Sequence, residues 1–149
     1  MKELSCKVII EMLKAGLEKA RELSVPESIA IVDEGGNLRG FIKEEGGKIA
    51  NITLAISKAW TAIALKRPTD QLMSIVEPGG FAYGINISEP RILPVGGGFP
   101  ITKDGINFLG GIGGSAGSVE QDVEICLAAL QVGGFMTKFP KYTYGKIKK

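Results

Sequence analysis

Histidine is absent from the 149 residues of this sequence, and cysteine occurs only twice. Histidine is the usual base of serine hydrolases, the usual partner of a catalytic cysteine and the imidazole ligand of haem and zinc. Those chemistries are therefore excluded from residues within the chain, and two cysteines are too few for a structural zinc site. Cys6 and Cys126 fall in helix-like segments, which favours small buried thiols in a reducing cytoplasm; a disulfide between the two helices is the alternative.

Long apolar runs are absent too. No stretch approaches the ~20 apolar residues that a membrane-spanning helix needs, so we expect no membrane partner. Glu11 interrupts the apolar run nearest the N-terminus, so we expect no secretory signal and a cytoplasmic location.

Acidic residues are missing from the last twelve positions, 138–149, which contain five lysines. The rest of the chain carries 13 basic and 16 acidic residues, so the net charge of +2 conceals a mildly acidic body. Nucleic-acid binding needs a basic face across the fold, and we expect none here. We interpret residues 1–135 as a single domain and residues 136–149 as a solvated basic tail, with an acidic partner for the tail as the alternative.

Glycine, in contrast, is abundant. It supplies 21 residues, about twice the usual ~7%, while the hydrophobic share of 44% and the charged share of 23% are ordinary for a globular domain. The glycines come in clusters without a fixed period, which predicts tight turns or backbone that lies close to another group.

The order of elements predicts the fold class. Apolar spacing, hairpin turns and caps such as Ser5 and the S-x-x-Q box at 118–121 indicate the element boundaries. We expect helices at about 5–23, 49–66, 69–76 and 118–132, and strands at 28–33, 38–43, 81–87, 98–102 and 106–112, with a further short strand between Pro90 and Pro94. Because the strands group in hairpins and do not alternate with helices, the sequence predicts an α+β domain with an antiparallel sheet covered by helices.

The stretch GGIGGSAGSVEQD, residues 110–122, matches the dinucleotide-binding pattern G-x-G-x-x-G/A in letters. That motif needs a βαβ unit with an acidic residue about 20 positions on, and residues 133–149 contain no Asp or Glu. The G-x-S-x-G pattern at 113–117 lacks a histidine base, and the Gly46-Gly47-Lys48 sequence lacks the Ser or Thr of a P-loop. What remains are backbone amides at a helix start that can bind an anion or a carbonyl oxygen; the alternative is close packing only.

Four segments in one order resemble a known family. They are DEGGNL (33–38), SKAWTA with RPT (57–62 and 67–69), GGFPI (97–101), and GGIGGS (110–115) followed by Asp122. In this order the chain is similar to the GlcG/HbpS family, which includes the C-terminal domain of PduO-type proteins, over roughly residues 4–133.

The resemblance implies a roughly five-stranded antiparallel sheet flanked by helices in profilin-like layers, and assembly into a homo-oligomer, either a dimer or a larger ring. It also implies a link to glycolate, diol or glycerol metabolism, haem binding in some members, and a corrinoid for PduO relatives. This chain has no histidine, so a Tyr, Cys or Met is the conceivable axial haem ligand; Tyr83, Cys6 and Met73 are candidates, and nothing in the sequence singles one of them out.

Several residues are candidates for a ligand site, each with a structural alternative. Lys58 and Thr61 lie three apart on one helix face, where Lys58 is either a pocket cation or a solvated surface lysine. Asp33 either lines the cleft or caps a turn, and Arg91 either binds a carboxylate or bridges subunits. The full candidate set is Asp33, Lys58, Thr61, Arg91, Gly97, Gly98, Pro100, Gly113, Gly114 and Ser115.

These features favour a small-molecule-binding or accessory protein over a self-sufficient enzyme, because amides and cations are present without a base of near-neutral pKa. One alternative is an enzyme acting on a small carboxylate or carbonyl compound, with Lys58 or Asp33 as the acid or base and the Ser115 loop as an oxyanion site. A second alternative is a purely structural oligomeric subunit. No metal site and no catalytic residue are assigned from the sequence.

Overall fold

The computed structural model describes residues 4–141. In chain order the elements are α1 (Cys6–Glu22), β1 (Ser28–Asp33), β2 (Leu38–Lys43), α2 (Ala50–Leu65), the 3-10 turn η1 (Thr69–Gln71), α3 (Met73–Val76), α4 (Ile85–Ser88), β3 (Gly98–Thr102), β4 (Phe108–Ser115) and α5 (Val119–Gly133). The strands form one antiparallel sheet in the order β2-β1-β4-β3. The predicted α+β class with an antiparallel sheet is confirmed.

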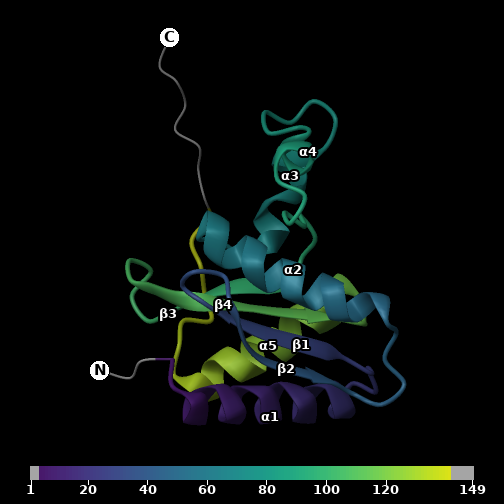
Figure 1. Cartoon of the computed structure of the whole chain (residues 1–149), viewed down its shortest axis with the longest axis vertical. Helices are drawn as coiled ribbons and strands as arrows, with labels where there is room; N and C mark the ends of the chain where they lie inside the picture. Colours follow the sequence, from purple (N-terminus) through teal and green to yellow (C-terminus); the bar gives the residue numbers. More distant parts are fainter. Residues whose placement is uncertain (1–3, 142–149) are drawn as a thin grey trace.

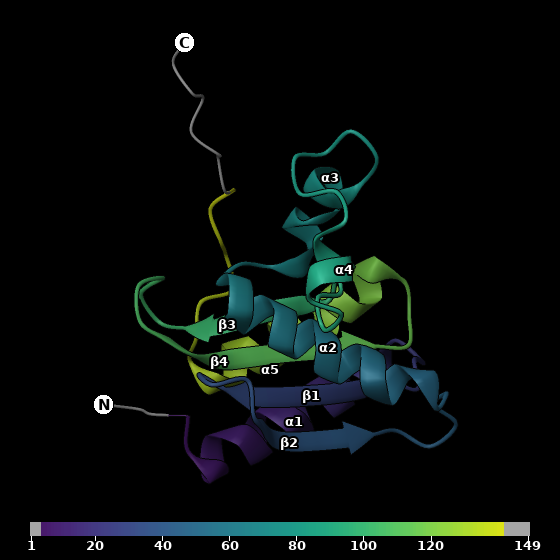
Figure 2. The same ribbon diagram turned by 45° about the horizontal axis from the view of Figure 1, so that its top comes forward.

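Helices cover both faces of the sheet, as Figure 1 shows. Helices α1 and α5 pack against each other on one face, and α2 crosses the other face over β1, β4 and β3. The segment that holds α3 and α4 projects away from these layers beyond α2, in both Figure 1 and Figure 2. The arrangement is therefore a three-layer α/β/α domain with one projecting segment.

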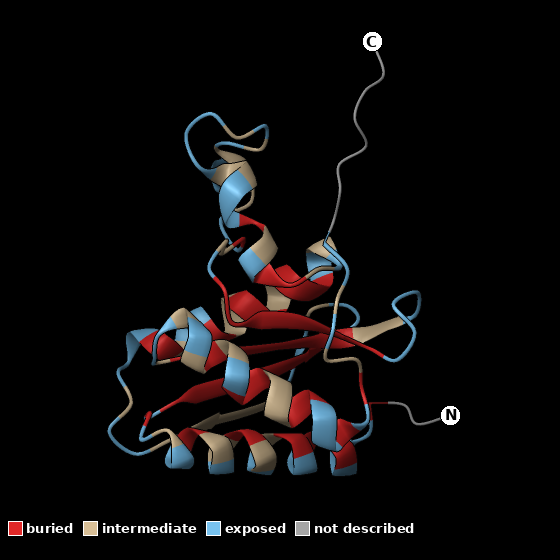
Figure 3. Cartoon of the chain, turned by 180° about the vertical axis from the view of Figure 1, so that it is seen from behind, coloured by how far each residue is buried: buried red, intermediate tan, exposed pale blue. Residues whose placement is uncertain are grey.

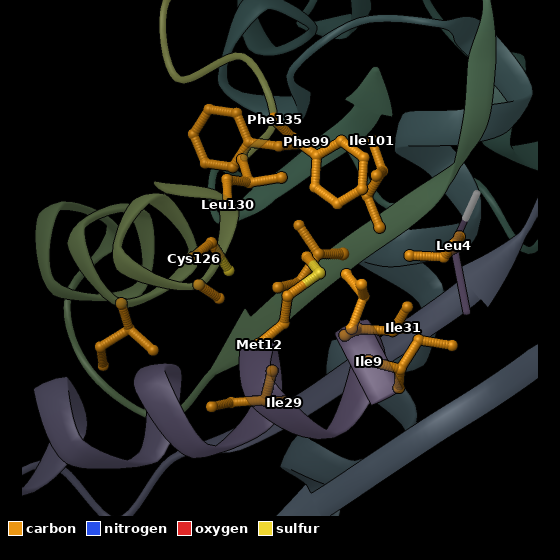
Figure 4. Close-up of a cluster of buried hydrophobic side chains, with 14 of the residues drawn as sticks. Leu4, Ile9, Met12, Ile29, Ile31, Phe99, Ile101, Cys126, Leu130 and Phe135 are labelled. Carbon is orange, nitrogen blue, oxygen red and sulfur yellow. The ribbon is translucent and has the colours of Figure 1, made fainter. Parts of the chain in front are cut away.

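Alternation along β1 divides the core between the two faces. Ile29 and Ile31 belong to the larger cluster under α1 and α5, whereas Ala30 and Val32 belong to a smaller cluster under α2. Figure 4 shows the larger cluster, in which Met12 lies among these strand residues and the side chains of α5. Figure 3 shows that β1, β3 and most of β4 are buried, whereas the edge strand β2 is not and much of the projecting segment is exposed.

The sheet has four strands among the described residues, fewer than the roughly five expected. Residues 81–87 form turns and then α4, because Gly84 adopts a left-handed φ of 85° that ends any extended run. Pro90 and Pro94 bracket irregular chain and no strand. Both strand predictions in this region were wrong, since Phe81 and Tyr83 point their apolar surface outward and pair with no sheet edge.

The remaining boundaries agree with the predicted ones within a few residues. The Ser5 side chain accepts a hydrogen bond from the Val8 N–H, and Ser118 with Gln121 forms the predicted capping box at the start of α5. Cys126 is buried and both cysteines are free, but Cys6 is exposed and not buried as expected, because it starts α1 on the solvent side.

The end of the described chain packs on the domain. The Met136 N–H donates to the Thr102 carbonyl, and the Phe139 ring lies 5.8 Å from the Phe99 ring. Residues 136–141 of the predicted tail therefore contact the body of the protein. Residues 142–149 lie outside the described residues.

Glycines in β4 allow α2 to lie directly on the sheet. A Cβ atom at Gly111 or Gly113 would overlap a backbone carbonyl of α2, that of Ala59 or Ala55. Close packing is thus one role of the glycine-rich stretch, and it brings the side chain of Lys58 to the end of the sheet.

Candidate functional site

Lys58 is a buried cation in α2. It is 3% exposed, and its Nζ donates to the Gly114 carbonyl and to Asp122 Oδ2, each at 2.9 Å. The lysine is therefore not the solvated surface residue of the structural alternative. It joins α2 to the end of β4 and the first turn of α5 through one ion pair and one hydrogen bond.

Asp122 receives hydrogen bonds on both carboxylate oxygens. Its Oδ2 pairs with Lys58, and its Oδ1 accepts from the backbone N–H groups of Ala116 at 3.2 Å and Gly117 at 2.9 Å. The amides of Ala116 and Gly117 in front of α5 thus bind an anion, which is the chain's own carboxylate, while a ligand-binding role of Gly113, Gly114 and Ser115 stays a prediction. The Gly114 N–H is also engaged, since it donates to the Gly97 carbonyl at 2.9 Å.

Gly97 lies against this ion pair. Its φ is 111°, and a Cβ atom there would lie 2.9 Å from the Asp122 Cβ and 3.0 Å from Lys58 Nζ. A side chain at this position would be strained by the backbone and would press on the pair. Lys58, Gly97 and Gly114 therefore lie close together in the fold.

Glu27 is a second buried acid beside Asp122. It is fully buried, and neither carboxylate oxygen has a hydrogen-bond partner among the described residues. Burial, then the neighbouring Asp122 carboxylate, raise the pKa of Glu27 to about 8, although the Lys58 charge opposes the shift. Burial also raises the pKa of the Cys126 thiol, whose Sγ lies 3.4 Å from the Gly97 carbonyl.

A cavity of about 250 Å³ opens beside the ion pair. Its polar wall includes Lys58, Asp122, Ser115 and Asn51, and the Ser115 hydroxyl lies 3.3 Å from Asn51 Oδ1. The remaining lining residues are Leu54, Leu93, Val95, Ala116, Gly117 and Val119. The cavity is therefore a small concave site with apolar sides and one polar wall, between α2, the end of β4 and the start of α5.

Thr61, in α2, forms a hydrogen bond with the end of the projecting segment. Its buried hydroxyl lies 2.7 Å from the Ser57 carbonyl and accepts the Leu93 N–H at 2.9 Å. Arg91 is exposed, pairs with Glu89 in the same segment and lies 3.9 Å from the ring centre of Trp60. Neither Thr61 nor Arg91 lines the cavity beside Lys58.

The other candidates lie elsewhere in the sheet. Asp33 pairs with Gly110, whereas Ser28 at the other end of β1 pairs with Ser115, so Asp33 lies about 17 Å from that end at ~3.4 Å per residue. Its carboxylate accepts the N–H groups of Asn37 and Gly35, and these bonds hold its pKa below the usual range. Gly98, Pro100 and Gly113 are buried strand residues that do not line the cavity.

Three residues of the site were not among the sequence candidates: Asp122, Glu27 and Asn51. Asp122 entered the sequence analysis only as part of the family motif, although its place five residues after Gly117 is suited to bind the loop amides. Glu27 directly precedes the buried strand SIAIVD, and an acid next to such a run is the signal that could have identified it.

The candidate haem ligands do not gather at a cavity. Tyr83 and Met73 are 68% and 53% exposed on the projecting segment, and Cys6 is exposed at the start of α1. Among residues 4–141, no group of three His, Cys, Asp or Glu side chains is placed to hold a metal ion. Within the same residues, no helix combines the length and the apolarity that crossing a membrane requires.

Two curated proteins illustrate the relatives of this chain. The corrinoid adenosyltransferase PduO of Salmonella typhimurium is 37% identical over 127 residues, which are 83% of this chain and 38% of PduO. An uncharacterised 15.0 kDa protein in the dhaT–dhaS intergenic region of Citrobacter freundii is 33% identical over 121 residues, 80% of this chain and 84% of that protein. The chain thus spans about 38% of the length of the PduO proteins that it matches.

Structural and family comparisons agree with these relatives. The crystal structure of a PduOC–haem complex has a TM-score of 0.86 and 34% identity, over 91% of this chain and 99% of that one. The family described as haem-degrading protein HbpS-like matches residues 4–131. The motifs, the fold and these matches converge, and the chain belongs to the HbpS-like family.

Proposed function

We propose that this chain is a small-molecule-binding or accessory protein and that the cavity beside Lys58 is its ligand site. The observation that carries the proposal is a cavity of about 250 Å³ with a wall of buried polar side chains facing apolar ones. Sites for small molecules are usually concave and mostly apolar, with a few polar groups that fix the orientation of the ligand. Lys58 and Ser115 are the two sequence candidates that line it.

The polar wall favours a ligand that accepts hydrogen bonds. The Lys58 ammonium has three N–H donors, and two of them bind Gly114 and Asp122. The Asn51 amide nitrogen has no hydrogen-bond partner among residues 4–141, and its oxygen lies near the Ser115 hydroxyl. A small carboxylate or carbonyl compound supplies acceptor oxygens for these donors, and the cavity is smaller than the ~300–1,000 Å³ of drug-sized sites.

The same geometry supports binding more than catalysis. Lys58 is committed to Asp122, and the amides of Ala116 and Gly117 are committed to the same carboxylate, so they are not arranged as an oxyanion site. Asp33, the other candidate acid or base, lies at the opposite end of β1. An enzyme that acts on a small carboxylate or carbonyl compound is therefore the alternative function. The enzyme alternative would be favoured if the protein turned over such a compound and the Lys58→Met variant remained folded but lost this activity.

Haem is the ligand of the PduOC complex. Haem iron needs an axial ligand inside a cavity. Tyr83, Met73 and Cys6 line none of the described cavities, and the sequence has no histidine. No role for haem or a corrinoid is proposed for this chain. A link to glycolate, diol or glycerol metabolism remains part of the proposal and rests on the family resemblance.

Self-association is the second part of the proposal. The projecting segment exposes several large apolar side chains, namely Met73, Phe81, Tyr83 and Ile87. Exposed apolar side chains of this kind are typical of surfaces that other chains cover, and a second copy is the expected partner. Light scattering after gel filtration should give the mass of a dimer or larger ring, and Phe81→Ser should reduce it. A monomeric wild-type protein at micromolar concentration would overturn this part.

Thermal-shift measurements with a panel of small carboxylates, aldehydes and ketones test the ligand site. A ligand present at 100 times its Kd stabilises the native state by about 2.7 kcal/mol. Leu54→Trp places a large side chain in the cavity wall and should abolish that stabilisation, whereas Leu38→Trp, on the exposed edge strand β2, should leave it intact. The assignment of the cavity as the ligand site is contradicted if no compound of the panel stabilises the protein, or if both variants lose the ligand-induced stabilisation equally.

A further inference from the structure

We propose that Glu27 is a proton-binding site, in which its buried carboxyl group beside Asp122 holds a proton in the folded protein and releases it as the pH rises. The release is expected to weaken ligand binding in the cavity beside Lys58. This last consequence rests on the proposed function, whereas the proton site does not.

The surroundings of Glu27 provide no hydrogen bond that would stabilise a charged carboxylate. The residue precedes β1, is 0% exposed, and has no hydrogen-bond partner for either carboxylate oxygen within the described chain. Oε1 would lie only 2.6 Å from a Cβ atom placed on Gly114, and that same Cβ would lie 3.0 Å from Cys126 Sγ. An ionised carboxylate enclosed in this way, without a donor from the described residues, is strongly disfavoured.

The charged groups around Glu27 are few. Helix α5 contributes the Asp122 carboxylate and the Cys126 thiol, and α2 contributes the Lys58 ammonium. The Glu44 N–H donates to the Glu27 backbone carbonyl, while the Glu44 side chain pairs with Arg21. Among these described groups there are therefore one cation and two carboxyl groups. The net charge of the cluster is zero when one of the two carboxyl groups is protonated.

The hydrogen bonds decide which acid holds the proton. Asp122 accepts hydrogen bonds from the Lys58 ammonium and from two backbone N–H groups, so both of its oxygens already serve as acceptors. Glu27 accepts no such bond. The proton therefore resides on Glu27, and the pKa of about 8 that burial and Asp122 cause is consistent with this placement.

Asp122 connects the proton site to the cavity. The groups that it holds, Lys58 and the amides of Ala116 and Gly117, belong to residues of the cavity wall. Ionisation of Glu27 adds a second negative charge that competes with Asp122 for Lys58. The wall then becomes negative, and the affinity for an anionic ligand is expected to fall as the pH rises through about 8.

Urea unfolding of the ligand-free protein tests the proton site directly. Because the pKa of Glu27 rises from 4.5 in the unfolded chain to about 8 in the folded one, the folded state binds one more proton between these values. The folding equilibrium constant should therefore fall about tenfold per pH unit from pH 5.5 to 7.5 and level off above pH 8. Glu27→Gln should remove this dependence, and the control Glu11→Gln on the exposed side of α1 should retain it.

Infrared spectroscopy of the wild-type protein provides a readout that does not depend on a variant. At pH 6.5 solvated carboxyl groups are ionised, so a C=O stretching band of a protonated carboxylic acid should persist and disappear between pH 7 and 9. A wild-type protein with no such band, or with a pH dependence that Glu27→Gln leaves unchanged, overturns the proposal. Failure of every ligand in the thermal-shift panel would overturn the proposed function and leave the proton site standing.

Discussion

Replacement of Asp122 by asparagine tests whether the buried ion pair organises this end of the domain. The two side chains of the pair are 3% and 4% exposed, and their atoms lie 2.9 Å apart. Asparagine has the same shape, and its oxygen can still accept the N–H groups of Ala116 and Gly117. The substitution therefore removes one charge and leaves the Lys58 ammonium buried with the Gly114 carbonyl.

The expected loss of stability is large. Removing one partner of a buried ion pair typically costs about 3–5 kcal/mol, which is a large part of the ~5–15 kcal/mol that stabilises a whole domain. At roughly 2–4 °C per kcal/mol for a chain of this size, the Tm should fall by about 10 °C. Within residues 4–141, Glu27 is the remaining acid near Lys58, so the double variant Glu27→Gln with Asp122→Asn should lose more stability than the two single variants together.

Urea and thermal unfolding at pH 7, followed by circular dichroism, measure these losses. The control is Glu22→Gln, which breaks the exposed pair between Lys19 and Glu22 and should leave the free energy of unfolding nearly unchanged. An Asp122→Asn protein as stable as the Glu22→Gln control would refute the reasoning, because the pair would then contribute nothing to the fold.

Three further predictions concern packing and reactivity. Gly113→Ala should destabilise the protein by several kcal/mol in urea unfolding, since its Cβ would overlap a backbone carbonyl of α2; wild-type stability would contradict the close packing. Thr61→Val should lower the free energy of unfolding by about 1–3 kcal/mol and speed hydrogen exchange at the Leu93 N–H, because this group loses its acceptor. Unchanged exchange would contradict the hydrogen bond between Thr61 and Leu93. Ellman's reagent should modify one thiol in the native protein and two in denaturant, since Cys6 is exposed while burial raises the pKa of Cys126; Cys6→Ser should abolish the native reaction, and a native reaction that persists would contradict this assignment.

Elements with strong local patterns were predicted well from the sequence. The Ser5 cap, the two hairpins and the capping box at Ser118 are determined by residues close in the chain, and each is present. The segment 81–94 was mispredicted as strands because its apolar residues suggest burial. In the structure those side chains are exposed on a projecting segment, and local composition does not reveal which surface faces outward.

The site was predictable only in part, for a physical reason. Lys58, Gly97, Gly114 and Ser115 were selected from the sequence and lie close together. The contacts of Asp122 with Lys58 and the loop amides depend on side chains of α2 and α5 meeting beside Gly97, just before β3. This is a long-range arrangement. Glu27 acquires its importance from the same arrangement, since its neighbours Asp122 and Cys126 are far away in the sequence.

The most direct test of the ligand site is chemical-shift mapping by NMR, with the panel of small carboxylates, aldehydes and ketones. The Asn51 side-chain amide and the backbone amides of Ser115, Ala116 and Gly117 surround the cavity and report on its occupancy. The proposed function predicts saturable shifts of these signals with at least one compound, and no such shifts in Leu54→Trp. Signals that stay unchanged with every compound, or that shift only at distant residues such as Asp33, would contradict it.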